Sequence, residues 1–179
     1  SIMFIVKVPG VNGNAGCGGT GDFDEDGNRS EIVVGVNGNI YAFYSNCTQM
    51  WSQGLIDSLN PNDIETGDLD NDGYKDDIAV IPSAVVVAAY LQIFNGSGES
   101  IWNSSKIAST TINSVKIGNI DNVVGEDIII DAFRQVNAYN GSGYNLWNFT
   151  NPTGSIYEIR FGNFSNNGTI AFVDDGQDV

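Results

Sequence analysis

Residues 67–78 read Gly-Asp-Leu-Asp-Asn-Asp-Gly-Tyr-Lys-Asp-Asp-Ile and lead directly into an apolar run. The carboxylates of Asp68, Asp70 and Asp72 alternate along the chain, and like charges side by side on one strand face would repel one another. A divalent cation removes this repulsion, because calcium takes about six to eight oxygen ligands and a glycine at the sixth loop position allows a sharp turn around the ion. The stretch therefore predicts a calcium-binding loop followed by a strand.

The expected ligands of this loop are the three alternating carboxylates, the backbone carbonyl of Tyr74 and one closing acid. Two residues compete for the closing position. Asp76 holds the ninth position of the loop, whereas Asp77 directly precedes the apolar strand. This loop alone leaves both residues as candidates.

Residues 21–32 repeat the same pattern with a glycine at the sixth position. The expected calcium ligands in this copy are Asp22, Asp24, Asp26, Asn28 and Glu31. Ser30 holds the ninth position here and Glu31 the tenth, which favours the tenth position as the closing one. The chain thus carries two complete acidic loops.

Two further loops, at 118–127 and 162–168, keep only parts of the pattern. The third loop has Asn119, Asp121 and Asp127 as weak metal candidates, but it lacks the central Asp-Gly pair. The fourth loop is almost uncharged. Because calcium affinity follows the number of charged ligands, we expect neither loop to hold the ion tightly.

Two sets of markers repeat along the chain with a similar period. The glycines that open the four loops are Gly21, Gly67, Gly118 and Gly162, at steps of 46, 51 and 44 residues. The tryptophans are Trp51, Trp102 and Trp147, at steps of 51 and 45 residues. A period in the forties with strand-like segments is typical of propeller blades. The sequence predicts an all-β fold: a β-propeller of about four blades, or part of a larger propeller, with four-stranded antiparallel blades.

Each repeat is expected to contain the acidic loop, two apolar strands, a hairpin turn, a tryptophan strand and a fourth strand that leads to the next loop. In this scheme the acidic loops lie at the junctions between blades. The tryptophans then pack between blades rather than serving as stacking platforms for sugars. We expect a single domain, 1–179, with repeats at approximately 21–66, 67–117, 118–161, and 162–179 combined with 1–20.

The two complete loops, each followed by Ile-Val-Val or Ile-Ala-Val, resemble the FG-GAP or VCBS repeats of integrin-α-like β-propellers. Residues 94–102 and 139–147 share an aromatic residue, an Asn-Gly-Ser-Gly turn and a final tryptophan, and they resemble the hairpins of quinoprotein-like propeller repeats. The first resemblance implies structural calcium ions and a role in adhesion and recognition.

The charge of the chain excludes several classes of function. The net charge is −15, with seven basic residues and no histidine. Such a chain has no basic surface for nucleic acid or for anionic membranes. Without histidine, Ser-His-Asp and Cys-His catalysis are excluded. The longest apolar stretch is too short and too interrupted for membrane insertion, which needs about 20 apolar residues.

The sequence also contains signs of export. Eight Asn-x-Ser/Thr sites could carry glycans: Asn28, Asn46, Asn95, Asn103, Asn140, Asn148, Asn163 and Asn167. Several fall at predicted turns, where a glycan can face water. In an oxidising compartment the two cysteines, Cys17 and Cys47, are expected to form a disulfide; the alternative is two unpaired small residues of the core. We therefore expect an extracellular or cell-surface glycoprotein.

These observations favour a non-enzymatic, calcium-binding β-propeller for cell-surface adhesion or architecture, with a protein or glycan partner and a possible tendency to self-associate. One alternative is a subunit of an extracellular filament assembled by strand exchange through residues 1–8. A second alternative is a carbohydrate-active enzyme on a calcium-stabilised propeller. Paired carboxylates could serve such an enzyme, but the acids outside the loops, such as Asp57 and Asp63, are scattered.

Overall fold

The computed structural model describes residues 16–83, 90–105, 107, 112–151, 156, 158–165 and 168–174. Within these ranges the chain is all-β, as predicted, and its only helical element is a short 3-10 segment at Ile56–Ser58. No helix in these ranges has the length and apolar character needed to cross a membrane. The predicted exchange segment 1–8, Asn167 and the side chain of Asn163 lie outside the described part.

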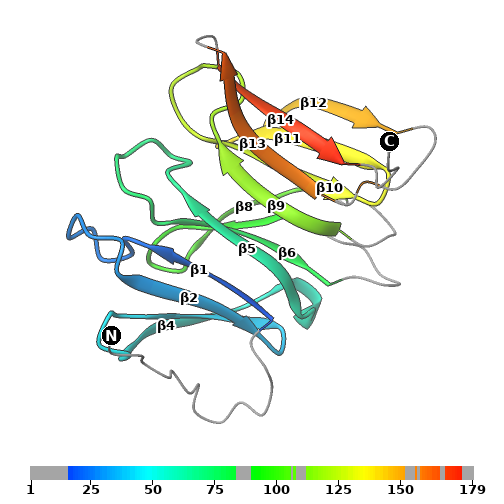
Figure 1. The fold of residues 1–179 in the computed structure, drawn as a ribbon. Coiled ribbons are helices and arrows are strands. Elements are labelled where there is room, and N and C mark those ends of the chain that lie inside the picture. The colour runs from blue at the N-terminus through cyan, green and yellow to red at the C-terminus, as the bar shows by residue number, and fades with distance from the viewer. Residues whose placement is uncertain are drawn as a thin grey trace.

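Twelve of the described strands form three antiparallel sheets, each with four strands in chain order (Figure 1). The first sheet consists of β1 (Cys17–Gly21), β2 (Glu31–Val36), β3 (Asn39–Phe43) and β4 (Gln49–Gly54). The second consists of β5 (Pro61–Gly67), β6 (Asp77–Pro82), β7 (Gln92–Phe94) and β8 (Ser100–Asn103). The third consists of β9 (Ile112–Gly118), β10 (Asp127–Ala132), β11 (Gln135–Asn140) and β12 (Asn145–Thr150). A final pair, β13 (Glu158–Ser165) and β14 (Gly168–Asp174), forms a two-stranded sheet.

The strand before each acidic loop belongs to the same sheet as the strand after it. In the second sheet Gly67 pairs with Asp77 across the loop. The first and third sheets have the same arrangement at their first hairpins. The prediction that the loops lie at junctions between repeats is therefore wrong, because each loop connects the first two strands of one sheet. A repeat period is the same wherever the unit is cut, so spacing alone cannot identify its first strand.

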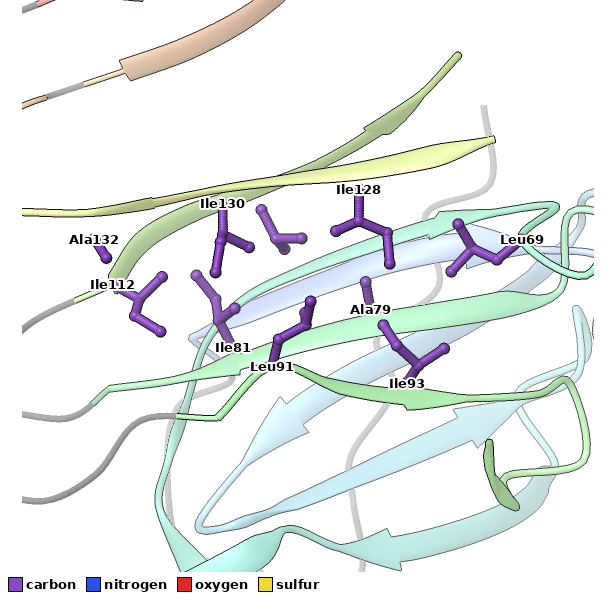
Figure 2. Close-up of a cluster of buried hydrophobic side chains, with 10 residues drawn as sticks. Leu69, Ala79, Ile81, Leu91, Ile93, Ile112, Ile128, Ile130 and Ala132 are labelled. Carbon is purple, nitrogen blue, oxygen red and sulfur yellow. The ribbon is translucent and has the colours of Figure 1, made fainter. Parts of the chain in front are cut away.

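The second sheet is buried on both faces. In β6 the side chains of Ile78 and Val80 pack in a cluster with the first sheet, and those of Ala79 and Ile81 pack in a cluster with the third sheet. This division follows from strand geometry, because successive side chains point to opposite faces. Figure 2 shows the second of these clusters, which joins two sheets through the side chains of Leu69, Ala79, Ile81, Leu91, Ile93, Ile112, Val115, Ile128, Ile130 and Ala132.

The first strands of successive sheets are neighbours, so β5 contacts both β1 and β9, and β9 also contacts β13. The hydroxyl of Thr66 donates to the carbonyl oxygen of Thr20 at 2.6 Å, which joins β5 to β1. The ammonium group of Lys116 lies 3.4 Å from the carboxylate of Asp63 and 3.2 Å from that of Glu65, which joins β9 to β5. Polar contacts thus connect the first strands of neighbouring sheets.

Two tryptophans on the fourth strands, β4 and β8, also connect neighbouring sheets. Nε1 of Trp51 in the first sheet donates to the carbonyl oxygen of Gly96 in the second sheet at 2.7 Å. Nε1 of Trp102 in the second sheet donates to the carbonyl oxygen of Gly141 in the third sheet at 2.8 Å. The prediction that these two tryptophans pack between repeats is confirmed.

The predicted disulfide between Cys17 and Cys47 is not formed, and both cysteines are free. Cys17 pairs with Gly35 near one end of the first sheet, whereas Cys47 follows Phe43 at the opposite end. Cys17 is level with Ile40, and Cys47 lies beyond Phe43, three residues further along, so at about 3.3 Å per strand residue the two positions lie at least about 10 Å apart. A disulfide needs Cα atoms within about 7 Å of each other. Burial, and to a smaller extent the charge of Asp63, raises the pKa of Cys17 to about 11, so this thiol is protonated near neutral pH.

Candidate metal centre

The first acidic loop, between β1 and β2, gathers three carboxylates. Oxygens of Asp22, Asp24 and Glu31 lie within 4.8 Å of one another. The loop is held from inside, because the two carboxylate oxygens of Asp22 accept hydrogen bonds from the amides of Asp26 and Gly27, both at 2.9 Å. Ligands brought this close in a folded loop can share one cation.

The second acidic loop, between β5 and β6, gathers Asp68, Asp70 and Asp72 within the same 4.8 Å limit. Oδ2 of Asp68 accepts a hydrogen bond from the amide of Gly73 at 3.1 Å, in the same way as Asp22 in the first loop. Gly73 has a φ of +100°, a left-handed conformation that favours glycine. This is the sixth-position glycine of the predicted calcium loop.

Both loops are anchored by the apolar residue between their first two acids. Phe23 and Leu69 are buried in the packing between sheets, each with about 5% of its surface exposed. Because the buried residue faces the core, the acids before and after it are presented to the loop. The anchors therefore fix the spacing of the carboxylates.

Three carboxylate oxygens in these loops are buried without a hydrogen-bond partner: Glu31 Oε2, Asp68 Oδ1 and Asp77 Oδ1. A buried charged oxygen without a partner is costly, and a bound cation would satisfy it. All the atoms that could bind the ion are oxygens, which favours a hard ion such as calcium or magnesium over zinc. The residues present therefore fit a divalent cation in each of the two loops.

The structure separates the two candidates for the closing acid. Oδ2 of Asp76 accepts a hydrogen bond from the amide of Gly96 at 3.1 Å, which turns this carboxylate toward the β7–β8 hairpin. Oδ2 of Asp77 instead accepts from the amides of Leu69 and Asp70 inside the loop, at 2.8 and 3.0 Å. The side chain of Asp77, the tenth residue, is therefore directed into the loop, which favours it over Asp76 as the closing ligand.

The remaining predicted ligands lie outside the two clusters of carboxylates. Asp26 is exposed, and its Oδ1 accepts hydrogen bonds from the backbone and side-chain nitrogens of Asn28 at 2.8 and 3.0 Å. The amide of Tyr74 donates to Asp72 Oδ1 at 2.8 Å. These contacts shape the loops, and metal binding by Asp26, Asn28 and the Tyr74 carbonyl stays a prediction.

Burial perturbs the acids that follow the second loop. It raises the pKa of Asp76 to about 6, with a further contribution from the charge of Asp72. It raises the pKa of Asp77 to about 7, where hydrogen bonds from Leu69 and Asp70 oppose the shift and the charge of Asp70 adds to it. A cation in the loop would act in the opposite direction, because a nearby positive charge favours the ionised form.

In the presence of a chelator, the protein is expected to lose stability as the pH rises from about 4 to about 8. The pKa values of Asp76 and Asp77 in the folded protein, about 6 and about 7, exceed their ordinary value of 3.8. Their contribution to the free energy of unfolding is therefore fully present below the pKa of the unfolded chain, and it is lost as the pH rises through the pKa values of the folded protein. Melting temperatures across this range measure the effect.

The Asp77→Asn variant serves as the comparison, because it keeps the shape of the side chain and removes its titration. Its melting temperature in chelator should depend less on pH than that of the parent protein. If both proteins showed the same pH dependence, or if the parent became more stable toward pH 8, the role given to Asp77 would be wrong.

The third loop, between β9 and β10, is closed by an amide group. Nδ2 of Asn119 donates to the carbonyl oxygens of Val123 and Gly125. Oδ2 of Asp127 accepts from the amide of Ile120 at 2.7 Å and, more weakly, from that of Asp121. The Asn119 side chain thus cross-links this loop by donating to two backbone carbonyl oxygens, whereas Asp22 and Asp68 hold the first two loops by accepting hydrogen bonds from backbone amides.

Consecutive loops also contact one another, which sequence reasoning missed. The amide of Asp22 donates to the carbonyl oxygen of Lys75 at 3.2 Å, which joins the first loop to the second. Glu126 of the third loop accepts from the ammonium group of Lys75 at 2.5 Å and from the amide of Asp68 at 2.8 Å. The loops therefore form a connected row along one end of the sheets.

The described sequons differ in exposure. Four have exposed asparagine side chains: Asn28, Asn46, Asn103 and Asn148. Asn95 and Asn140 are half-buried, and each accepts two hydrogen bonds inside its hairpin turn. Glycosylation stays a prediction, with the four exposed positions as the most accessible.

No protein-family model and no curated protein matches this sequence. The crystal structure of BBS1N in complex with ARL6DN, soaked with mercury, matches with a TM-score of 0.61 and 13% identity, over 82% of this chain and 44% of that chain. Rhamnogalacturonan lyase YesW matches with a TM-score of 0.63 and 15% identity, over 90% of this chain and 40% of that chain. The exotype rhamnogalacturonan lyase YesX matches with a TM-score of 0.63 and 14% identity, over 94% of this chain and 41% of that chain.

This chain therefore spans less than half the length of these matched structures. At such identities the likeness concerns the fold alone. Because the same fold occurs in lyases and in a protein crystallised with a binding partner, it does not determine whether this chain is an enzyme.

Proposed function

We propose that this chain is a calcium-stabilised β-propeller that serves cell-surface adhesion or architecture without enzymatic activity. The observation that carries the proposal is the pair of acidic loops in which carboxylates cluster within 4.8 Å. Buried oxygens of Glu31, Asp68 and Asp77 in these loops lack a hydrogen-bond partner, which supports a bound cation at each loop. The ion would neutralise carboxylates in a chain whose net charge is −15.

The order of the sheets supports the propeller. Successive four-stranded antiparallel units, with their first strands adjacent along one line, are typical of propeller blades around a common axis. The pair β13 and β14 would supply the first two strands of a fourth blade. The FG-GAP or VCBS resemblance of the loops agrees with this architecture.

The hydrogen-bonding roles of the described acids support a structural function. Asp131 is fully buried, and its carboxylate accepts hydrogen bonds from the amides of Asn113 and Ser114 at 2.8 and 3.0 Å. Asp63 and Glu65 bind Lys116 across two sheets. These three acids stabilise the fold through hydrogen bonds and ion pairs.

Two alternatives remain as proposals. The likeness to rhamnogalacturonan lyases favours a carbohydrate-active enzyme as the second candidate. The filament alternative depends on residues 1–8, which lie outside the described structure. The proposed partner in adhesion is a protein or glycan at the cell surface, in keeping with the four exposed sequons.

Calorimetric titration of chelator-treated protein with calcium tests the proposal. We expect about two sites per chain, on the basis of ligand number and charge. The Asp24→Asn and Asp70→Asn variants should each lose one site. Absence of binding, or an unchanged stoichiometry in both variants, would contradict the calcium assignment.

Incubation with polysaccharides tests the enzymatic alternative separately. Rhamnogalacturonan is the first probe, because two of the matched structures are lyases of this substrate. With saturating calcium we expect no release of unsaturated or reducing products. Product release that depends on the concentration of this protein would replace the non-enzymatic proposal, whatever the result of the calcium titration.

A further inference from the structure

The first and second acidic loops contact each other through their backbones. The amide of Asp22, the first acid of the first loop, donates to the carbonyl oxygen of Lys75 in the second loop at 3.2 Å. The two backbones approach closely at this point, since a Cβ atom at Gly21 would lie 2.8 Å from the same carbonyl oxygen. The position of a candidate ligand in one loop is therefore tied to the backbone of the other loop.

Lys75 lies between candidate ligands of the second loop. It directly follows Tyr74, whose carbonyl is a predicted ligand, and it stands two residues before Asp77. Hydrogen bonds from the amides of Leu69 and Asp70 direct the Asp77 side chain into the loop. An ion that draws these groups together also fixes the Lys75 carbonyl between them. Without an ion, the carboxylates that cluster within 4.8 Å repel one another, and this repulsion works to open the loop.

The second loop is supported by the third loop on its other side. The carboxylate of Glu126 accepts hydrogen bonds from the ammonium group of Lys75 at 2.5 Å and from the amide of Asp68 at 2.8 Å. The amide of Glu126 in turn donates to the carbonyl oxygen of Asp68 at 3.3 Å. The third loop is cross-linked by its own Asn119 side chain, so it gives the second loop a fixed support. With that side fixed, a rearrangement of the second loop alters its contact with the first loop.

We propose that calcium binding to the second loop strengthens calcium binding to the first loop through the hydrogen bond between Lys75 and Asp22. This coupling concerns the same two ion sites and rests on the proposed function. An ion in the second loop fixes the carbonyl of Lys75, which holds the backbone of Asp22 in place for the ion of the first loop. Coupling between two binding sites is reciprocal, so each ion raises the affinity for the other by the same factor. We expect a factor of about five, which corresponds to one ordered hydrogen bond.

Charge alone predicts coupling of the opposite sign. Each loop, at 22–31 and 68–77, contains five acids and one basic residue. An ion that neutralises part of one loop lowers the negative potential at the other loop, which weakens binding of the second ion. At about 0.15 M salt, exposed charges more than about 8 Å apart are largely screened from each other, whereas a direct hydrogen bond is not. The sign of the coupling and its change with salt therefore distinguish the two effects.

Calcium titrations of three proteins at about 0.15 M salt measure the coupling. The Asp70→Asn variant is expected to keep only the first site, the Asp24→Asn variant only the second, and the parent both. The overall binding constant for two ions in the parent should exceed the product of the two single-site constants by about fivefold. Lower salt should reduce this factor, because the two sites then oppose each other more strongly through charge. A factor of one or below would overturn the coupling and leave calcium binding itself intact.

Amide hydrogen exchange tests the contact within a single protein. In the Asp24→Asn variant, calcium is expected to fill the second loop alone. The amide of Asp22 should then exchange about fivefold more slowly, because its acceptor, the carbonyl of Lys75, is fixed. The control is the amide of Leu55, which donates to the carbonyl oxygen of Gly38 at the opposite end of the first sheet. Its exchange rate should change by a smaller factor.

The two experiments separate failure of the coupling from failure of the proposed function. Equal slowing at Asp22 and Leu55 would indicate general stabilisation and would overturn the coupling. An unchanged exchange rate at Asp22, with calcium bound to the second loop, has the same consequence. Absence of calcium binding in the parent protein would overturn the proposed function and the coupling together, whereas independent binding of two ions would overturn the coupling alone.

Discussion

Saturating calcium is expected to raise the melting temperature of chelator-treated protein by about 5–10 °C for each occupied loop. A ligand that binds only the folded state at about 100 times its dissociation constant contributes about 2.7 kcal/mol. In a domain of 179 residues, each kcal/mol shifts the melting temperature by roughly 2–4 °C. Differential scanning calorimetry in calcium and in chelator measures this shift.

The Asp70→Asn variant separates ion binding from other effects of charge. Asp70 is exposed, and its Oδ1 accepts a hydrogen bond from the amide of Asp72, which an asparagine oxygen can also accept. In chelator the variant should melt at the same temperature as the parent or slightly higher, since one repulsive charge is gone. In calcium it should melt lower than the parent.

Asp57→Asn is the matched control for this variant. Asp57 is also exposed and lies outside the acidic loops, and its φ of 58° is one that asparagine tolerates. Its gain in melting temperature from calcium should equal that of the parent. Identical melting of the parent protein in calcium and in chelator would contradict the structural role of the ion.

Replacement of Gly141 by alanine is expected to destabilise the protein by about 3 kcal/mol, which corresponds to a fall of roughly 6–12 °C in melting temperature. A Cβ atom at this position would overlap the backbone carbonyl of Leu69. Backbone atoms cannot move aside as a flexible side chain can, so the whole hairpin turn must shift. The shift also removes the hydrogen bond from Trp102 to the Gly141 carbonyl.

Gly54→Ala provides the comparison for this substitution. A Cβ atom at Gly54 would meet its nearest neighbour, Asn39 Oδ1, at 3.6 Å, which is an ordinary contact. This variant should stay within about 0.5 kcal/mol of the parent. Chemical denaturation gives both values. A Gly141→Ala protein as stable as the Gly54→Ala protein would show that the second and third sheets do not pack through this turn.

Local patterns along the chain were sufficient for the strands and for the first two loops. Alternating carboxylates before a glycine at the sixth position predict a loop that gathers oxygens, because this geometry is set by a few consecutive residues. The apolar segment after each loop likewise predicted β2, β6 and β10, since strand formation depends on residues that are close in sequence. The tryptophan spacing predicted packing between repeats.

Contacts between residues far apart in sequence determined the rest. Pairing across the loop places β5 with β6, which no repeat spacing reveals. The amide of Gly96 donates to Asp76, whereas Asp77 accepts from amides inside the second loop, which favours Asp77 as the closing ligand. The same long-range geometry keeps Cys17 and Cys47 at opposite ends of one sheet, because strand register sets their distance. Loop chemistry is thus local, whereas sheet membership, the directions of the Asp76 and Asp77 side chains and the free thiols depend on contacts between distant residues.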